Sequence, residues 1–131
     1  MYKLKITDLS VGDWVRWNDK TYRVCVIDGV SLTVELAEEL GGTIEVAIDE
    51  LTGIPITPEI LEKNGFKKNG KYNEWNIGEW DERPFIGVSL DRQSMRITDL
   101  GTDIFVVRQV VCVHQLQHAI RLAGIEKEIE L

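Results

Sequence analysis

The chain has 131 residues and a mass of 14.9 kDa, with 44% apolar residues, 28% charged residues and a formal net charge of −7. This length suits one domain or two very small ones, and the apolar content is too high for a disordered chain. Acidic residues exceed basic ones by five over residues 1–56 and by two over residues 57–131. Because long-range attraction to phosphates needs positive charge, we do not expect double-stranded nucleic acid as a partner.

The expected location of the protein is the cytoplasm. Residues 1–8 alternate charge and apolarity instead of forming the apolar core of a secretory signal. The strongest apolar run, residues 104–113, contains Arg108 and is far shorter than the ~20 residues that cross a bilayer, so no membrane association is expected. Cys25 and Cys112 stand in apolar stretches, which is typical of free, buried thiols.

A period of two residues dominates the chain from Leu4 to Ile56. Apolar and polar side chains alternate in short runs, and turn residues such as those of Gly41-Gly42 separate the runs. Five short strands bury their apolar face most readily when the sheet closes on itself, so we expect a small closed β-barrel. The strands are predicted at residues 3–7, 14–17, 22–27, 31–36 and 44–49.

Two stretches of this half resemble the opening of SH3-like small barrels. In residues 9–17 a Gly12-Asp13 turn precedes a strand, and in residues 22–28 an aromatic residue and alternating valines form a second one. The resemblance implies an SH3-like barrel, with Trp17 and Tyr22 inside it. It implies a shape and no activity, because such barrels serve peptide-binding, nucleic-acid-binding and purely architectural roles.

A stretch with two prolines, residues 54–58, marks the boundary between the halves. Proline lacks an N–H and favours extended geometry in the residue before it, which ends the strand pattern. Thr57 suits the N-cap of a short helix and Gly65 its left-handed end, after which Phe66 is expected to fold back onto the helix. We therefore predict two subdomains, residues 1–56 and residues 57–131.

The second half is predicted to be an antiparallel meander. Asn69-Gly70 is a strong signal for a two-residue type I′ hairpin turn. Further strands are expected at residues 85–90, 94–98 and 104–107. Five apolar side chains of these strands are expected to face inward: Ile86, Val88, Leu90, Met95 and Ile97.

The end of the chain changes its period. Over about residues 111–123 apolar residues recur at three and four, which predicts a C-terminal helix. Residues 125–131 alternate again and are expected to form a last edge strand or a docked extended tail, with disorder as the alternative. The fold class predicted for the chain is mainly β, or α+β: a small SH3-like β-barrel, then an antiparallel meander with a short helix and a C-terminal helix.

Two segments carry a second resemblance. Residues 54–66 and residues 113–118 are similar to segments of small uncharacterised proteins that gut bacteria, their phages and mobile elements encode. The resemblance implies a phage or mobile-element context. Because that group has no established activity, no functional residue is carried over from it.

His114 and His118 are the only histidines, and their spacing is that of two metal ligands on one helix face. The zinc-protease pattern needs a Glu beside the first His, and Gln115 stands there instead. At about 100° per residue, the apolar side chains of the helix centre on the opposite side. We therefore expect both imidazoles to face solvent, with a partner contact and then a metal site as the lesser alternatives.

Aromatic and lysine side chains are the main candidates for binding. Trp75 and Trp80 flank a polar loop, and exposed indoles are usually retained where they contact something. Lysines gather around the short helix and hairpin, Lys63 among them, where they could hold a nucleotide by charge and stacking or could form a solvated edge that discourages strand addition. The candidate binding residues are Trp14, Tyr72, Trp75, Trp80, Lys67, Lys68 and Lys71.

No phosphate-binding glycine loop, paired-carboxylate motif or nucleophile elbow stands in the sequence. The sequence therefore favours a non-enzymatic binding or adaptor module, without a cofactor, for a protein or a small molecule. The alternative is a protein that sequesters a small anionic nucleotide. A metal-dependent hydrolase using His114 and His118 ranks last. The oligomeric state stays open.

Overall fold

The computed structural model describes residues 3–71, 73–78, 85–99, 102–109 and 112–131, and it divides the chain into two compact units. Residues 1–55 with 112–114 form unit 1, and residues 56–111 with 115–131 form unit 2. In unit 1 the elements are η1 (Ile6–Asp8), β1 (Trp14–Trp17), β2 (Lys20–Asp28), β3 (Thr33–Ala37), β4 (Thr43–Ala47) and η2 (Ile48–Glu50), where η is a 3₁₀ turn. Then follow α1 (Pro58–Lys63), β5 (Lys67–Asn69), β6 (Glu74–Ile77), β7 (Phe85–Ser89), β8 (Ser94–Asp99), β9 (Thr102–Arg108) and α2 (Val113–Leu122).

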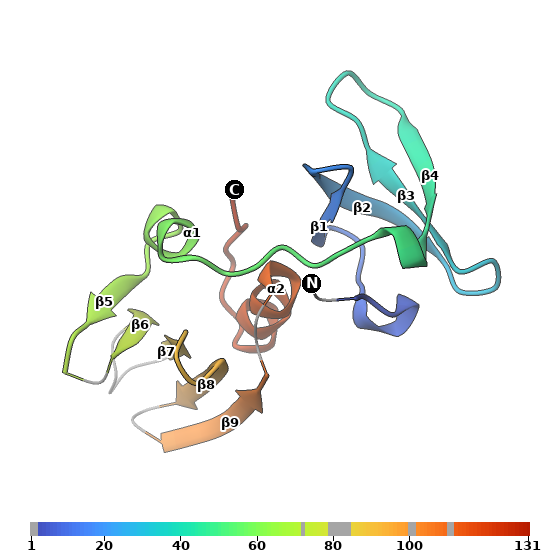
Figure 1. Ribbon diagram of the computed structural model, residues 1–131. Helices are drawn as coiled ribbons and strands as arrows, with labels where there is room; N and C mark the ends of the chain where they lie inside the picture. The colour runs from blue at the N-terminus through green and yellow to red at the C-terminus, as the bar shows by residue number, and fades with distance from the viewer. Residues whose placement is uncertain (1–2, 72, 79–84, 100–101, 110–111) are drawn as a thin grey trace. The chain divides into compact units, whose positions relative to one another are not determined.

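Unit 1 is built on an antiparallel sheet with the order β1-β2-β3-β4 (Figure 1). The register pairs Val24 with Leu36 and Val34 with Val46, so apolar residues of neighbouring strands share one face. Trp17 and Tyr22 are partly buried against this core with ring centroids 5.9 Å apart, as the sequence predicts. The fully buried part of the core consists of Leu4, Leu9, Val15, Val24, Val34, Leu36, Val46 and Leu51.

Two predictions about unit 1 are wrong. Residues 3–7 form no strand, because the side chain of Asp8 accepts the backbone N–H of Lys5 at 2.9 Å and closes the turn η1. The described strands also do not close into a barrel, since β1 and β4 are the two edges of the sheet. Thr52 reaches β1 only through an isolated bridge to Arg16, with N–O distances of 2.9 and 3.1 Å, because η2 has already ended the strand pattern.

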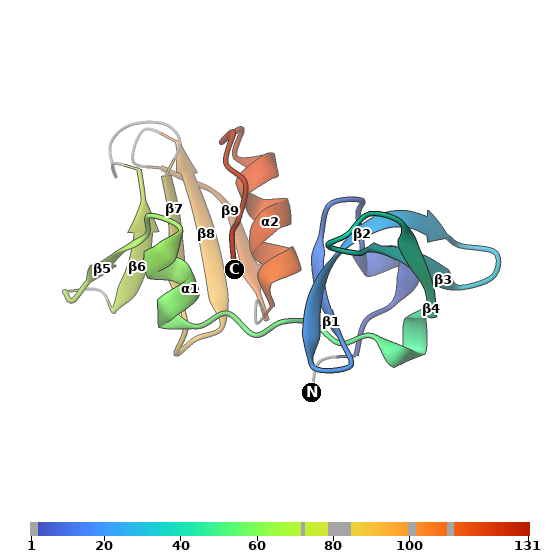
Figure 2. The same ribbon diagram turned by 90° about the horizontal axis from the view of Figure 1, so that it is seen from above.

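Unit 2 contains a five-stranded antiparallel sheet with the order β5-β6-β7-β8-β9. Helices α1 and α2 lie on the same side of this sheet, and the C-terminal tail runs between them (Figures 1 and 2). Four of the five side chains predicted to face inward are buried, Ile86, Val88, Met95 and Ile97, whereas Leu90 is half-buried in the β7–β8 turn. The mainly β, α+β class predicted from the sequence is confirmed. None of the described helices has the length and apolarity needed to cross a membrane.

Helix α1 begins and ends as its sequence predicts. The hydroxyl of Thr57 accepts the backbone N–H of Ile60 at 3.2 Å. At the other end Gly65 has a φ of +87°, and the N–H of Phe66 donates to the carbonyl of Leu61 at 3.0 Å. This is a Schellman motif, in which the two residues joined by that bond usually also pack together. Phe66 and Leu61 are both buried.

The type I′ turn predicted at Asn69-Gly70 does not form. Asn69 pairs with Glu74, so four residues, Gly70 to Asn73, connect β5 to β6. The side chain of Asn69 accepts the backbone N–H of Lys71 at 3.1 Å, and Asn73 takes the left-handed conformation with a φ of 50°. An Asn side chain that bonds the backbone two residues on favours a longer turn over a tight one.

The C-terminal tail is docked rather than paired as a strand. The side-chain amide of Asn64 donates to the carbonyl of Glu130 at 2.8 Å and accepts its N–H at 2.8 Å. The same amide donates to the carbonyl of Ile60 in α1 at 2.8 Å. Asn64 and Ile129 are each 1% exposed. One buried amide therefore joins the end of α1 to the tail.

We expect Asn64→Ala to destabilise the protein by about 1–3 kcal/mol, because it removes three part-buried hydrogen bonds and leaves the N–H and the carbonyl of Glu130 without this partner. Urea denaturation measures this loss, and the amide of Glu130 should exchange faster with solvent. Lys63→Ala is the control, since it removes only an exposed bond to the carbonyl of Leu131 and should cost less than about 0.5 kcal/mol. A loss for Asn64→Ala no larger than that of the control would contradict this docking.

Both cysteines are free, but only Cys112 is buried. Cys25 is half-buried where the register of β2 shifts, between Val24 and Val26, which corrects the prediction that both thiols are buried. A register shift of this kind redirects the side chain of the extra residue. Burial raises the pKa of the Cys112 thiol to about 11.

We expect an alkylating reagent at about pH 8 to modify Cys25 and spare Cys112, because only an accessible thiolate reacts. Peptide mass spectrometry measures this, and both thiols should react in denaturant. The pKa of Cys112 rises from 9.0 to about 11 on folding. Its ionisation therefore leaves stability unchanged below about pH 9 and reduces stability as the pH rises from 9 to 11. Equal modification of both thiols in the native protein would contradict the assignment.

Candidate functional site

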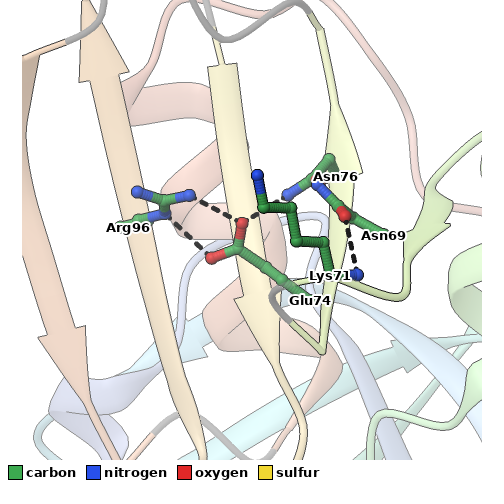
Figure 3. A network of polar contacts seen from close by, with 5 residues as sticks. All are labelled: Asn69, Lys71, Glu74, Asn76 and Arg96. Carbon is green, nitrogen blue, oxygen red and sulfur yellow. Dashed lines mark hydrogen bonds and ion pairs between the residues drawn. The ribbon is translucent and has the colours of Figure 1, made fainter.

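A row of polar residues crosses the face of the unit 2 sheet opposite its apolar core. The register pairs Asn76 of β6 with Gly87 of β7, and Gly87 with Arg96 of β8. Because side chains alternate along a strand, these residues and Glu74 share one face, while Ile86 and its neighbours occupy the other. Figure 3 shows the polar side chains together over β6, β7 and β8.

Glu74 and Arg96 form the centre of this row. The Nε and Nη2 atoms of Arg96 donate to the two carboxylate oxygens of Glu74, each at 2.8 Å. The side-chain amide of Asn76 adds a third hydrogen bond at 2.6 Å, to Oε1 of Glu74. Glu74 is only 8% exposed. A bidentate charge-assisted pair of this kind fixes both side chains in one geometry.

Gly87 makes this pair possible. The pair joins β6 to β8, so the side chain of Glu74 lies across the intervening strand (Figure 3). A Cβ atom at position 87 would lie 2.5 Å from both Cδ and Oε2 of Glu74. No side chain fits there without displacing the carboxylate. An isolated glycine in a strand often marks such a close approach, and this was the one signal in the sequence that could have located the site.

A cavity of about 1050 Å³ opens on this face of the sheet. Most of its lining is able to form hydrogen bonds, with the carboxamides of Asn69, Asn73 and Asn76 and the hydroxyls of Ser89 and Ser94. Its charged lining residues are Lys71, Glu74, Arg92 and Arg96. Among the described residues, the lining therefore contains three cations and one anion, although the whole chain has a net charge of −7.

Three residues with apolar side chains complete the lining: Phe85, Met95 and Val106. The guanidinium of Arg96 lies 5.6 Å from the ring centroid of Phe85, which is 4% exposed. Val106 of β9 pairs with Arg96 and is 54% exposed, so it presents an apolar surface on a polar face. The described lining therefore consists mainly of fixed polar groups with a few apolar side chains, whereas sites for small molecules are usually lined mainly by apolar side chains with a few polar groups.

Of the aromatic candidates, none in the described part of the chain lines this cavity. Trp75 alternates with Glu74 and Asn76, so it belongs to the opposite face, where the ammonium of Lys68 lies 5.6 Å from its ring centroid. Trp14 belongs to unit 1 and is half-buried with the guanidinium of Arg23 4.8 Å from its ring centroid. Tyr72 and Trp80 lie outside the described residues.

The four lysines that were predicted to cluster have different contacts in the structure. Lys71 lines the cavity, and Lys67 is exposed on the edge strand β5. Lys68 donates to the side chain of Asn73 at 2.7 Å. Lys63 donates to the carbonyl of Leu131 at 2.6 Å. Of the four lysines, only Lys71 belongs to the candidate site.

The prediction that both histidines face solvent is wrong. His114 is 1% exposed and His118 is half-buried. The prediction assumed that only the apolar side of α2 is buried. In the structure a wider part of the helix surface is buried, which includes Val113, His114, Leu116, Gln117, Ala119 and Ile120. Within the described residues, no three His, Cys, Asp or Glu side chains are grouped so that they could hold a metal ion.

Comparison with known proteins gives no match to a family model, to a curated protein or to a solved structure.

We expect Gly87→Ala to destabilise the protein by about 1–3 kcal/mol, because the new methyl group displaces the carboxylate of Glu74 from Arg96. Urea denaturation of a double-mutant cycle with Glu74→Ala checks the cause. With the carboxylate removed, the same change at position 87 should cost less than about 0.5 kcal/mol. Equal costs in the two backgrounds would show that Gly87 is required for another reason.

Proposed function

We propose that the chain is a non-enzymatic binding module whose ligand is a small molecule held in the cavity on the polar face of the β5–β9 sheet. The observation that carries the proposal is the fixed Glu74–Arg96–Asn76 network in the wall of that cavity. Polar groups that are already ordered lose little conformational entropy when a ligand binds. The network therefore suits recognition by hydrogen bonds.

The chemistry of the lining supports binding over catalysis. Carboxamides, hydroxyls and cations orient a ligand, and these groups dominate the described lining. Glu74 supplies the one carboxylate among the described lining residues, and its oxygens accept three hydrogen bonds from Arg96 and Asn76. Protein donors therefore occupy three of the about four acceptor positions of this carboxylate. A general base needs hydrogen-bond reach to the proton that it abstracts.

The shape of the site supports a small molecule over a protein partner. Cavities that hold small molecules typically have volumes of roughly 300–1000 Å³. The cavity has a volume of about 1050 Å³, slightly above the upper end of that range. Protein interfaces depend more on buried aromatic anchors, whereas the one described aromatic ring in this lining, that of Phe85, is already covered.

A screen of chemically mixed small compounds, followed by two-dimensional NMR of the labelled protein, tests this function. Compounds that bind should shift the side-chain amide of Asn76, the Nε signal of Arg96 and the backbone amide of Ser94. Ser94→Trp should abolish these shifts, since the indole fills a cavity of this size. Thr21→Trp is the matched control, because Thr21 is an exposed strand hydroxyl in unit 1.

The proposal fails if no compound shifts the signals of the cavity face. It also fails if the compounds that bind retain their shifts in Ser94→Trp. A well-dispersed spectrum for each variant shows that the fold is retained.

A further inference from the structure

We infer that the ligand of this cavity is an uncharged small molecule that carries several hydroxyl groups on a saturated skeleton, as a sugar or a cyclic polyol does. This inference rests on the proposed binding function and adds the chemical class of the ligand. It depends on the hydrogen-bond donors and acceptors that the lining residues leave available, and on the small apolar area of the lining.

The polar lining residues lie in two neighbouring rows across the sheet. In the first row Asn69 of β5 pairs with Glu74 of β6, and Ser89 of β7 pairs with Ser94 of β8. The second row lies two residues further along these strands, about 7 Å away at ~3.4 Å per residue. Its members in the order of the register are Asn76, Gly87, Arg96 and Val106.

The first row supplies hydrogen-bond donors. The hydroxyl of Ser89 accepts the backbone N–H of Arg92 at 3.3 Å and keeps its own proton to donate. The side-chain oxygen of Asn69 accepts the backbone N–H of Lys71 at 3.1 Å, which leaves the NH₂ group of Asn69 as a donor. The side chain of Ser94 bonds to no other described residue, so its hydroxyl can both donate and accept.

Asn76 and Glu74 supply acceptors beside these donors. The side-chain amide of Asn76 donates to Oε1 of Glu74 at 2.6 Å (Figure 3). Because a carboxylate only accepts, this bond fixes which end of the amide is the donor, and Oδ1 of Asn76 is an acceptor that no described group uses. Glu74 itself accepts three hydrogen bonds and keeps one of its about four acceptor positions.

A hydroxyl is the ligand group that matches this mixture. It donates one proton and accepts at two lone pairs, so a single hydroxyl can bond to a serine and to Oδ1 of Asn76 at the same time. A carboxylate has no proton to give, and an ammonium has no lone pair. Either ion would therefore leave part of these polar groups without a partner, which costs binding free energy. Several hydroxyls on one skeleton can engage both rows.

The apolar part of the lining is too small for a large aromatic or aliphatic ligand. Phe85 and Met95 are 4% and 1% exposed, so among the described apolar side chains of the lining only Val106, at 54%, offers a free surface. Ligands with a large apolar surface occupy sites that are mainly apolar. A saturated ring with hydroxyls needs only a small apolar contact for its C–H groups, and Val106 provides one beside the polar rows.

The class of the ligand does not depend on the charge of the site. Arg92 stands next to Asp91 in the sequence. Residues 79–84 connect the lining residues Gly78 and Phe85, contain three acidic residues and one arginine, and lie outside the described part of the chain. We therefore assign no excess charge to the site, and an uncharged ligand requires none.

Titrations of matched compounds followed by two-dimensional NMR test the inference. myo-Inositol carries a hydroxyl on every carbon of its ring, whereas cyclohexanol carries only one on the same ring. We expect inositol to bind at least about tenfold more tightly, because the analogue leaves polar groups of the site unpaired. The backbone amide of Ser94 and the side-chain amides of Asn69 and Asn76 should shift.

Glucose is the sugar, and its charged matches are glucuronate and glucosamine. Neither charge should strengthen binding by more than about threefold, since hydrogen bonds to the hydroxyls provide the affinity. Raising the salt concentration should leave the affinity for glucose unchanged. Binding of inositol without glucose, or of glucose without inositol, supports the inference and identifies whether the skeleton is that of a polyol or a sugar.

Variants of one hydroxyl then identify the contact. Ser94→Ala should weaken the binding of inositol and glucose by about three- to tenfold, because it removes one hydrogen-bonding group. Ser94→Thr retains a hydroxyl on a residue that suits a strand, and it should restore most of the affinity. Ser31→Ala is the matched control, because Ser31 is an exposed serine of unit 1. The control should leave the affinities unchanged.

The outcomes separate this inference from the proposed function. A preference for inositol over cyclohexanol below the expected level, a charged match that exceeds the stated limit over glucose, or full affinity in Ser94→Ala would each overturn the inference. Other compounds of the mixed screen that bind while inositol and glucose do not, with shifts that Ser94→Trp abolishes, would overturn it and leave the binding function intact. Failure of the whole screen, with inositol and glucose included, would remove both.

Discussion

The passage of the Glu74 side chain over Gly87 to Arg96 is the constraint on which unit 2 depends. Breaking a largely buried ion pair leaves an uncompensated charge, which is far more costly than the net contribution of the intact pair. A slip of one residue between β6 and β7 would move Glu74 to the apolar face, away from Arg96. The pair therefore excludes alternative registers of the three central strands, and the same geometry forms the wall of the cavity.

The two units use their sheets differently. The fully buried core described for unit 1 consists of valine and leucine, and five of its eight residues come from the strands β1 to β4. In unit 2 both faces of β7 are buried, because Ile86 and Val88 pack into the core while Phe85 and Gly87 are covered by the polar row. A sheet whose second face is ordered by hydrogen bonds needs a fixed set of side chains there. That requirement explains why the candidate site lies in unit 2.

Local rules were sufficient to predict much of the fold from the sequence. The cap at Thr57 and the left-handed Gly65 define α1 through bonds within a few residues, and alternation located most of the strands. The failures occurred where a side chain competes with the expected backbone geometry, as Asp8 does at η1 and Asn69 does at the turn after β5. The closed barrel was predicted from five expected strands. One of these, at residues 3–7, is replaced in the structure by the 3₁₀ turn η1.

The candidate site was hidden for a different reason. The sequence pattern is typical of solvent-facing positions on amphipathic strands for Glu74, Asn76 and Arg96. These residues come together only through the register between β6, β7 and β8. That register depends on pairings between strands, which no spacing within one strand shows. Gly87 is the one residue of this site that departs from the pattern of an apolar strand. A glycine within a strand weakens the strand, and it often marks a place where another group approaches the backbone closely.

The alternation of β6 also determines on which face of the sheet Trp75 lies. Positions 74 and 76 share a face, so Trp75 must belong to the other one, and an aromatic ring on a core-facing position is favoured because it buries a large apolar area. A chain rich in tryptophan therefore need not recognise its ligand by stacking on indole. In this sheet the groups that remain on the open face are amides, hydroxyls and cations. The proposed function therefore assigns recognition on this face to hydrogen bonding.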